Sequence, residues 1–197
     1  MSNQKTNQTL DVNDALAQSE AFVIKYKKQI IAAAVAVVVV VGGFIAYIYG
    51  YSKPREDKAQ ELLGVVMQKY VMQQDFEKAL KGEGKTMGLT KIAETYSSTD
   101  AGNLAAYEAG LCYYQLGKNS DAIKYLEKFS PKGDNTISAQ ALYALANCYA
   151  NAKQLDKSVD TFKKAAKATN VPALAAEYLF QAATILQSQN KNDEALK

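Results

Sequence analysis

The sequence predicts an all-α protein in which one transmembrane helix is followed by a solenoid of helical hairpins. Three observations lead to this fold class. Residues 29–52 contain no charged side chain, the whole chain has only three prolines, and the part beyond the uncharged run repeats a pattern about every 36 residues. Because proline ends helices, its scarcity leaves long stretches free to be helical. Alternating β-branched runs bounded by turn residues, which would predict strands, are missing after the run.

The composition argues against several classes of function. The chain carries 23 Lys and Arg against 20 Asp and Glu, with two cysteines and no histidine. This balance is unlike the concentrated basic face of a nucleic-acid binder. Without histidine the chain lacks the commonest general base and the commonest metal ligand, and two cysteines alone complete no zinc site. We therefore expect a non-catalytic protein without metal, cofactor or nucleic-acid partner.

The uncharged run at 29–52 predicts an uncleaved membrane anchor in contact with lipid. About 20 apolar residues cross the hydrocarbon core, and this run is long enough. Lysines precede it, Lys53 and Arg55 follow it, and tyrosines near both ends suit the two membrane interfaces. A buried core helix of this length would carry charges, and a signal peptide would be shorter and end in small residues. Residues that represent the span are Ile30, Val40, Gly42, Gly43 and Tyr49.

The flanking charges bear on the orientation of the span. Three lysines lie within four residues before it, and three basic residues follow it less closely. The N-terminal lysines have no acids among them, which favours a cytoplasmic N-terminus. Residues 1–28 are expected to form a polar tail with a short amphipathic helix. That helix either lies on the membrane surface or a partner, or simply extends the spanning helix.

Residues 53–197 are predicted to form a domain of helical repeats. Residues 55–80 place their apolar side chains on one side of a single helix, and residues 81–88 contain three glycines, which predict a loop. A second helix is expected at 89–96. We interpret 55–96 as a divergent hairpin that leads the repeats.

A repeated helix–turn–helix pattern follows this hairpin. A shift of 36 residues places Gly110 on Ala146, and the same shift places Cys112 on Cys148. The pattern is that of tetratricopeptide repeats, in which a small residue lies where two helices touch and a tyrosine follows three residues later. Stacked neighbours supply the core that no single hairpin can bury. The repeats are expected at about 103–135, 139–171 and 174–197.

The two cysteines occupy one repeat position seen twice. Equivalent points on stacked helices lie about 10 Å apart, whereas a disulfide needs Cα atoms within about 7 Å. We therefore expect Cys112 and Cys148 to be unpaired packing groups. The third repeat stops within its second helix, so we also expect the natural chain to continue beyond Lys197.

The order of these segments resembles that of single-pass bacterial envelope proteins ancillary to the Sec translocon, the YfgM-like family. The likeness covers the chain from about Phe22 onward, and it rests on organisation and on residues 94–129, which read ETYSSTDAGNLAAYEAGLCYYQLGKNSDAIKYLEKF. The resemblance implies a repeat domain on the periplasmic side of the bacterial inner membrane. It implies association with SecYEG and with a membrane-anchored periplasmic chaperone or prolyl isomerase, and a role in passing secreted client proteins onward.

Tetratricopeptide repeats bind ligands on a concave face that the first helix of each hairpin lines. Tyrosine offers a large contact area with a polar tip, and Asn and Gln can hold a peptide backbone. The tyrosines can also serve only to cover neighbouring helices. The residues expected on this face are Leu104, Tyr107, Glu108, Leu111, Tyr114, Gln115, Gln140, Tyr143, Asn147, Asn151, Phe180, Gln181, Thr184 and Gln187.

The function that combines these features is a membrane-anchored interaction protein at the secretion channel, which binds partners or clients in the periplasm. Two alternatives keep the same fold. One is a repeat scaffold for another envelope assembly complex, and the other is an adaptor that faces the cytoplasm.

Overall fold

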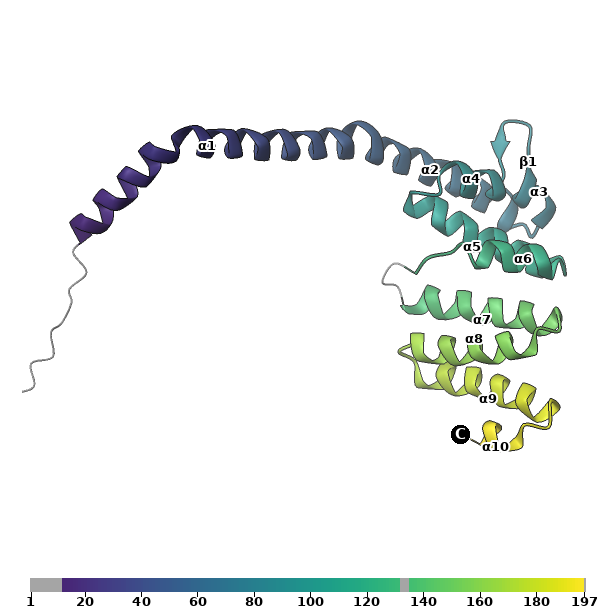
Figure 1. Cartoon of the computed structure of the whole chain (residues 1–197). Helices are drawn as coiled ribbons and strands as arrows, with labels where there is room; N and C mark the ends of the chain where they lie inside the picture. Colours follow the sequence, from purple (N-terminus) through teal and green to yellow (C-terminus); the bar gives the residue numbers. More distant parts are fainter. Residues whose placement is uncertain (1–11, 132–134, 197) are drawn as a thin grey trace, which may run out of the picture. The chain divides into compact units, whose positions relative to one another are not determined.

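The computed structural model describes residues 12–131 and 135–196, and it confirms an all-α fold with helical repeats (Figure 1). The chain divides into two compact units, residues 1–51 and 52–197, and each is described by itself. The polar tail expected at residues 1–10 lies outside the described residues.

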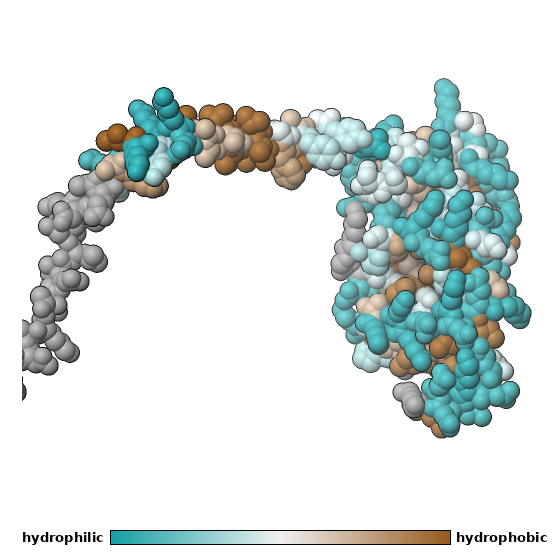
Figure 2. All heavy atoms as spheres, viewed as in Figure 1, coloured by the Kyte–Doolittle hydropathy of each residue, from teal (hydrophilic) through white to brown (hydrophobic). Residues whose placement is uncertain are grey.

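The first unit contains α1 (Val12–Tyr47), and the π-helix η1 (Ile48–Ser52) begins at its end. The residues from Val12 to Lys28 belong to α1, so the short helix expected before the span is continuous with the spanning helix, which is one of the two alternatives given for it. Apolar side chains gather along the middle of α1, where Figure 2 shows a brown band. This stretch is long and apolar enough to cross a membrane. None of its most apolar part is buried inside the protein. Signal sequences and the core helices of soluble proteins can be as long and as apolar.

The second unit is a series of hairpins (Figure 1). From α4 onward each helix packs mainly on its neighbours along the chain, whereas α2 and α3 pack mainly on α5. The first repeat begins with helix α5 at Asp100, slightly before the expected position, because the Thr99 hydroxyl accepts a hydrogen bond from the Gly102 N–H at 3.0 Å. The repeat helices are α5 (Asp100–Gln115), α6 (Asn119–Leu126), α7 (Asn135–Asn151), α8 (Leu155–Ala168), α9 (Pro172–Ser188) and α10 (Asn192–Ala195).

All three hairpins turn through the same backbone geometry. One residue in each turn has a left-handed conformation, with φ of 71° at Gly117, 61° at Lys153 and 61° at Asn190. Its N–H donates to the carbonyl three residues earlier, and the next N–H donates to the carbonyl five residues before it. These bonds satisfy carbonyls that the end of a helix leaves free.

The same turn occurs once more, at Gln74 with φ of 58°, within the segment predicted to be one helix over 55–80. That prediction is wrong, because the chain reverses there and Asp75 caps a new helix by accepting from the Lys78 N–H at 3.3 Å. Ala79 lies nine residues after Tyr70 and is buried, as Ala122 is nine residues after Tyr113. The leading segment is therefore a hairpin of the same kind. Its helices are α2 (Lys53–Val66), η2 (Met67–Val71) and α3 (Phe76–Lys81).

The short second helix of this leading hairpin is followed by an insertion. Residues 81–88, predicted to be a loop, contain the antiparallel strands β1 (Gly82–Glu83) and β2 (Thr86–Met87). Gly84 has φ of 61°, which suits the first position of a two-residue hairpin turn. Helix α4 (Leu89–Thr95) follows, close to the helix expected at 89–96. It packs on α5.

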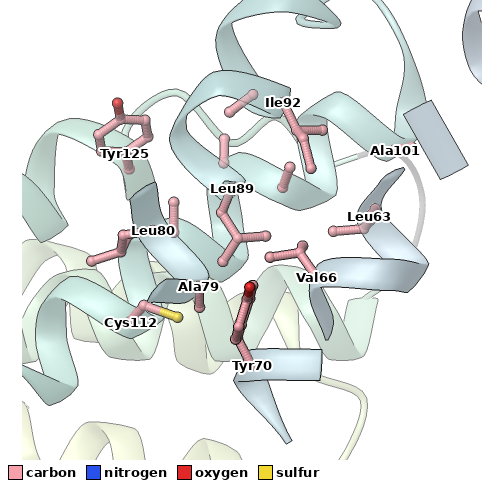
Figure 3. Packing of buried hydrophobic residues seen from close by; sticks show 14 of the residues in the cluster. Leu63, Val66, Tyr70, Ala79, Leu80, Leu89, Ile92, Ala101, Cys112 and Tyr125 are labelled. Carbon is pink, nitrogen blue, oxygen red and sulfur yellow. The ribbon is translucent and has the colours of Figure 1, made fainter. Parts of the chain in front are cut away.

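The core of the leading hairpin is shared with α4 and α5. Figure 3 shows Leu63, Val66 and Tyr70 from the first helix pointing toward Leu89 and Ile92 of α4. Leu89 and Ile92 are fully buried. Helix α4 thus supplies apolar contacts that the six-residue α3 is too short to make.

Close approach of the two helices in each hairpin depends on a small residue. A Cβ added at Gly110 would lie 2.5 Å from Cγ of Leu126, so α5 and α6 touch at this glycine. In the next hairpin Ala146 has the same place and its carbonyl accepts from the Ser158 hydroxyl at 2.8 Å. The buried serine that departs from the usual alanine is therefore satisfied.

Candidate protein-binding face

The first helices of the hairpins, α2, α5, α7 and α9, carry the candidate face, and a carboxylate fixes the first two to each other. Glu56 on α2 accepts from the N–H of Asp100 at 2.6 Å and from the N–H of Ala101 at 3.0 Å. A carboxylate at a helix N-terminus satisfies free N–H groups and interacts well with the helix dipole. The groove between α2 and α5 is therefore held by polar contacts at one end and by the core below.

The structure gives the fourteen predicted face residues three degrees of exposure. Tyr107 is buried. The half-buried residues are Leu104, Glu108, Leu111, Tyr114, Tyr143, Asn147 and Gln181. The exposed residues are Gln115, Gln140, Asn151, Phe180, Thr184 and Gln187.

The aromatic residues of this face differ in how deeply they are buried. Tyr107 is only 7 % exposed and its ring lies 5.4 Å from that of Phe129, so it supports the face from below. Burial, followed by the charge of Glu108, raises the pKa of Tyr107 to about 12. Phe180 is 68 % exposed and offers most of its ring to a partner.

Tyr143 links the second and third repeats across the face. Its ring lies 5.0 Å from that of Tyr178 and 5.7 Å from that of Phe162. Tyr178 was not among the predicted face residues, because Phe180 was expected at the position of the third repeat that corresponds to Tyr143. The aromatic contact between repeats thus comes from a residue two positions earlier.

Some of the side-chain amide and hydroxyl groups on this face already form hydrogen bonds within the chain. The Asn147 side chain donates to the Tyr143 carbonyl at 2.9 Å, and the Thr184 hydroxyl donates to the Phe180 carbonyl at 2.9 Å. Asn151 donates to the side chain of Asn119 at 3.2 Å. These bonds hold side chains against their own or neighbouring helices, which leaves mainly the glutamines to contact a peptide backbone.

Glu108 is the one acidic residue among the predicted face residues. Its side chain is half-buried on α5, and among the described residues it has no hydrogen bond or ion pair. Burial raises the pKa of this carboxyl above its ordinary value. Uncompensated burial of a carboxylate is unfavourable, so a cation supplied from outside would be stabilising here.

A hollow of about 400 Å³ opens between α2 and α5, one turn before Glu108. A Cβ added at Gly64 would have no atom within 4 Å, so this glycine faces open space. Gly64 lies six residues before Tyr70, and the matching positions before the other three turns are Tyr107, Tyr143 and Phe180. The hollow was missed because the turn at Gln74 was not recognised. Its lining residues are Glu56, Gln60, Leu63, Gly64, Asp100, Ala101 and Leu104.

The two cysteines are buried and free, as their repeat spacing predicts. Burial raises the pKa of Cys112 to about 12 and that of Cys148 to about 11. The described part of the chain contains no group of three or more His, Cys, Asp or Glu placed to hold a metal ion.

The fold and the exposed face define a helical-repeat protein of the class that binds other proteins. The repeats are tetratricopeptide repeats: residues 104–130 match one tetratricopeptide-repeat family model and residues 139–170 match another. These segments correspond to the first and second repeats expected from the sequence. No curated protein matches the chain. Domains of this kind usually act as interaction modules without catalytic activity.

Proposed function

We propose that the protein is a membrane-anchored adaptor whose concave face, formed by the first helices of its hairpins, holds segments of partner proteins. The observation that carries the proposal is the stack of tetratricopeptide repeats, on which Phe180 and several glutamines are exposed and Tyr114 is half-buried. Aromatic side chains at solvent-facing positions give large contact areas for little loss of side-chain entropy.

Site-specific photocrosslinking tests the face directly. Tyr114 and Tyr143 are each replaced by benzoylphenylalanine in the full chain, and Lys164, which is exposed on α8, is replaced as the matched control. We expect crosslinks to partner proteins from the two tyrosine positions and few from Lys164. Equal crosslinking from all three positions would contradict the proposed face.

Membrane anchoring by α1 is the second part of the proposal. Its apolar side chains are exposed over the stretch 30–45, where a water-soluble helix would carry polar residues. In lipid an α-helix satisfies its own backbone groups, so the valine-rich sequence suits this role. Carbonate extraction of membranes should leave the full chain in the pellet, and its release into the supernatant would contradict anchoring.

A periplasmic location for the repeats follows from the flanking lysines and from the resemblance to ancillary translocon proteins. Both natural cysteines are buried, so the test needs an engineered surface thiol in a Cys112→Ser, Cys148→Ser background. We expect Gln187→Cys to react with a membrane-impermeant maleimide in intact cells and Gln4→Cys to react only after lysis. The reverse pattern would place the repeats in the cytoplasm.

The Sec translocon and a membrane-anchored periplasmic chaperone or prolyl isomerase are the proposed partners, with secreted proteins as clients. This part of the proposal rests on the resemblance of the segment order. Affinity purification from gently solubilised membranes should enrich SecYEG subunits with the full chain, and a chain with the α1 span replaced by an unrelated one is the control. Enrichment of another envelope complex without SecYEG would replace this assignment.

A further inference from the structure

The groove between α2 and α5 contains the hollow described above. Leu104, which is one of the face residues, lines it together with Leu63 and Gly64. The hollow has a volume of about 400 Å³ and is open to solvent at Gly64. The Glu56 carboxylate at its edge is already bonded to two N–H groups of α5. The rest of the lining is mostly apolar, so the hollow suits an aliphatic side chain.

The acidic residue next to this hollow has no cation of its own. Lys58 on α2 and Lys69 on η2 are engaged elsewhere, since Lys58 pairs with Glu61 at 2.8 Å and Lys69 donates to Thr86 at 3.2 Å. No described residue forms an ion pair with Glu108. A partner segment that brings a Lys or Arg would complement this half-buried charge, and an acidic segment would be repelled.

The hollow and Glu108 are spaced for an extended peptide. Leu104 and Glu108 lie four residues apart on α5, which is one turn or roughly 6 Å along the helix axis. Side chains two residues apart on an extended strand point to the same side and lie roughly 6.6 Å apart. One side chain can therefore enter the hollow while its neighbour two positions away reaches the carboxylate.

We propose that this groove binds an extended partner segment in which an aliphatic residue and a Lys or Arg are separated by one residue. The aliphatic side chain occupies the hollow at Gly64, and the basic side chain pairs with Glu108. The inference rests on the proposed function, since it assigns a ligand to part of the concave face.

Peptide binding to the full chain in detergent micelles tests the assignment. The probes are short fluorescein-labelled peptides that carry Leu-Ser-Lys or Lys-Ser-Leu between Gly-Ser spacers, with Leu-Ser-Glu and Ser-Ser-Lys peptides as controls. Anisotropy is read against empty micelles. We expect the two Leu/Lys peptides to bind at least about fivefold more tightly than either control, with weaker binding at high salt. Equal affinity of the Leu-Ser-Glu peptide would overturn the inference.

Two variants assign the binding to these residues. Glu108→Gln removes the charge without changing the shape, and Gly64→Leu fills the hollow with a better helix former. Each should weaken the Leu/Lys peptides by about fivefold or more, whereas Glu177→Gln on α9 should leave binding unchanged. Wild-type affinity in both Glu108→Gln and Gly64→Leu would overturn the inference.

Photocrosslinking at Tyr143 in the same variants separates this inference from the proposed function. If crosslinks to partners persist while the peptides fail to bind the wild-type chain, the groove assignment is wrong and the adaptor function stands. If crosslinks are also absent from the wild-type face, both fall.

Discussion

Replacement of Gly110 by alanine should destabilise the repeat domain, although alanine is the better helix former. The added Cβ would lie 2.5 Å and 2.8 Å from two carbons of Leu126 and 3.2 Å from its backbone nitrogen. Leu126 is 3 % exposed and packs against Tyr107, Ala122 and Cys148, so it cannot swing into solvent. The two helices of the hairpin must therefore move apart, or Leu126 must be held in a strained position.

The magnitude follows from two opposing effects. Overpacking of a core costs about 1–3 kcal/mol, and the Gly-to-Ala change in a helix gains about 1 kcal/mol. We expect Gly110→Ala to lower the free energy of unfolding by up to about 2 kcal/mol. The matched control is Gly64→Ala, whose new Cβ has no atom within 4 Å and which should raise it by about 0.5–1 kcal/mol.

Urea unfolding of the full chain in micelles, followed by far-UV circular dichroism, measures both variants. Because repeat arrays need not unfold in one step, the comparison uses shifts of the transition midpoint. A second-site change, Leu126→Val, should relieve part of the effect of Gly110→Ala, since contacting residues are not additive. If Gly110→Ala and Gly64→Ala both stabilise the chain, the close contact between α5 and α6 is refuted.

Three further predictions concern buried groups. Burial raises the pKa of the Glu108 carboxyl in the folded state. The stability of the fold should therefore fall as pH rises from the ordinary glutamate pKa of about 4.3 through the raised pKa. Thermal melts at pH 4 and 7 should show this fall in the wild type and less of it in Glu108→Gln. Cys112 and Cys148, with pKa values raised to about 12 and 11, should resist Ellman's reagent at pH 8 until urea unfolds the chain, and fast labelling of the native protein would contradict their burial. Phe162→Ala should cost about 3–5 kcal/mol, because its ring is 1 % exposed between two repeats, and a midpoint shift below that of Gly110→Ala would argue against this.

The sequence allowed prediction of the repeats and their packing pairs, because these depend on side-chain size at fixed spacing. Gly110 and Ala146 lie where two helices must touch, and this requirement leaves a periodic mark. The leading hairpin keeps only part of this mark, the spacing of Tyr70 and Ala79. Its turn has Gln74 in the left-handed conformation, and its second helix is shortened by the β1–β2 insertion. Glycine would have marked the turn, as Gly117 does in the first repeat.

The binding face stays a prediction, and the structure adds the exposure of its residues. Gln115 is exposed and Tyr114 is half-buried. Local side-chain bonds, such as that from Asn147 to the Tyr143 carbonyl, depend on rotamers that a sequence does not specify. The hollow depends on Gly64. Its correspondence to the aromatic positions of the other hairpins can be seen only after the turn at Gln74 is aligned with the other turns.

The four turns also explain why the leading hairpin can diverge without losing its fold. In each turn the stabilising bonds join backbone groups, for example from the Asp75 N–H to the Tyr70 carbonyl, so almost any residue can occupy the sequence there. A residue other than glycine in the left-handed backbone conformation costs about 1–2 kcal/mol. Gln74, Lys153 and Asn190 adopt this conformation, so packing offsets the cost at three of the four turns. Position 64 is glycine where the other hairpins have an aromatic residue, and a hollow lies there while the hairpin keeps its turn.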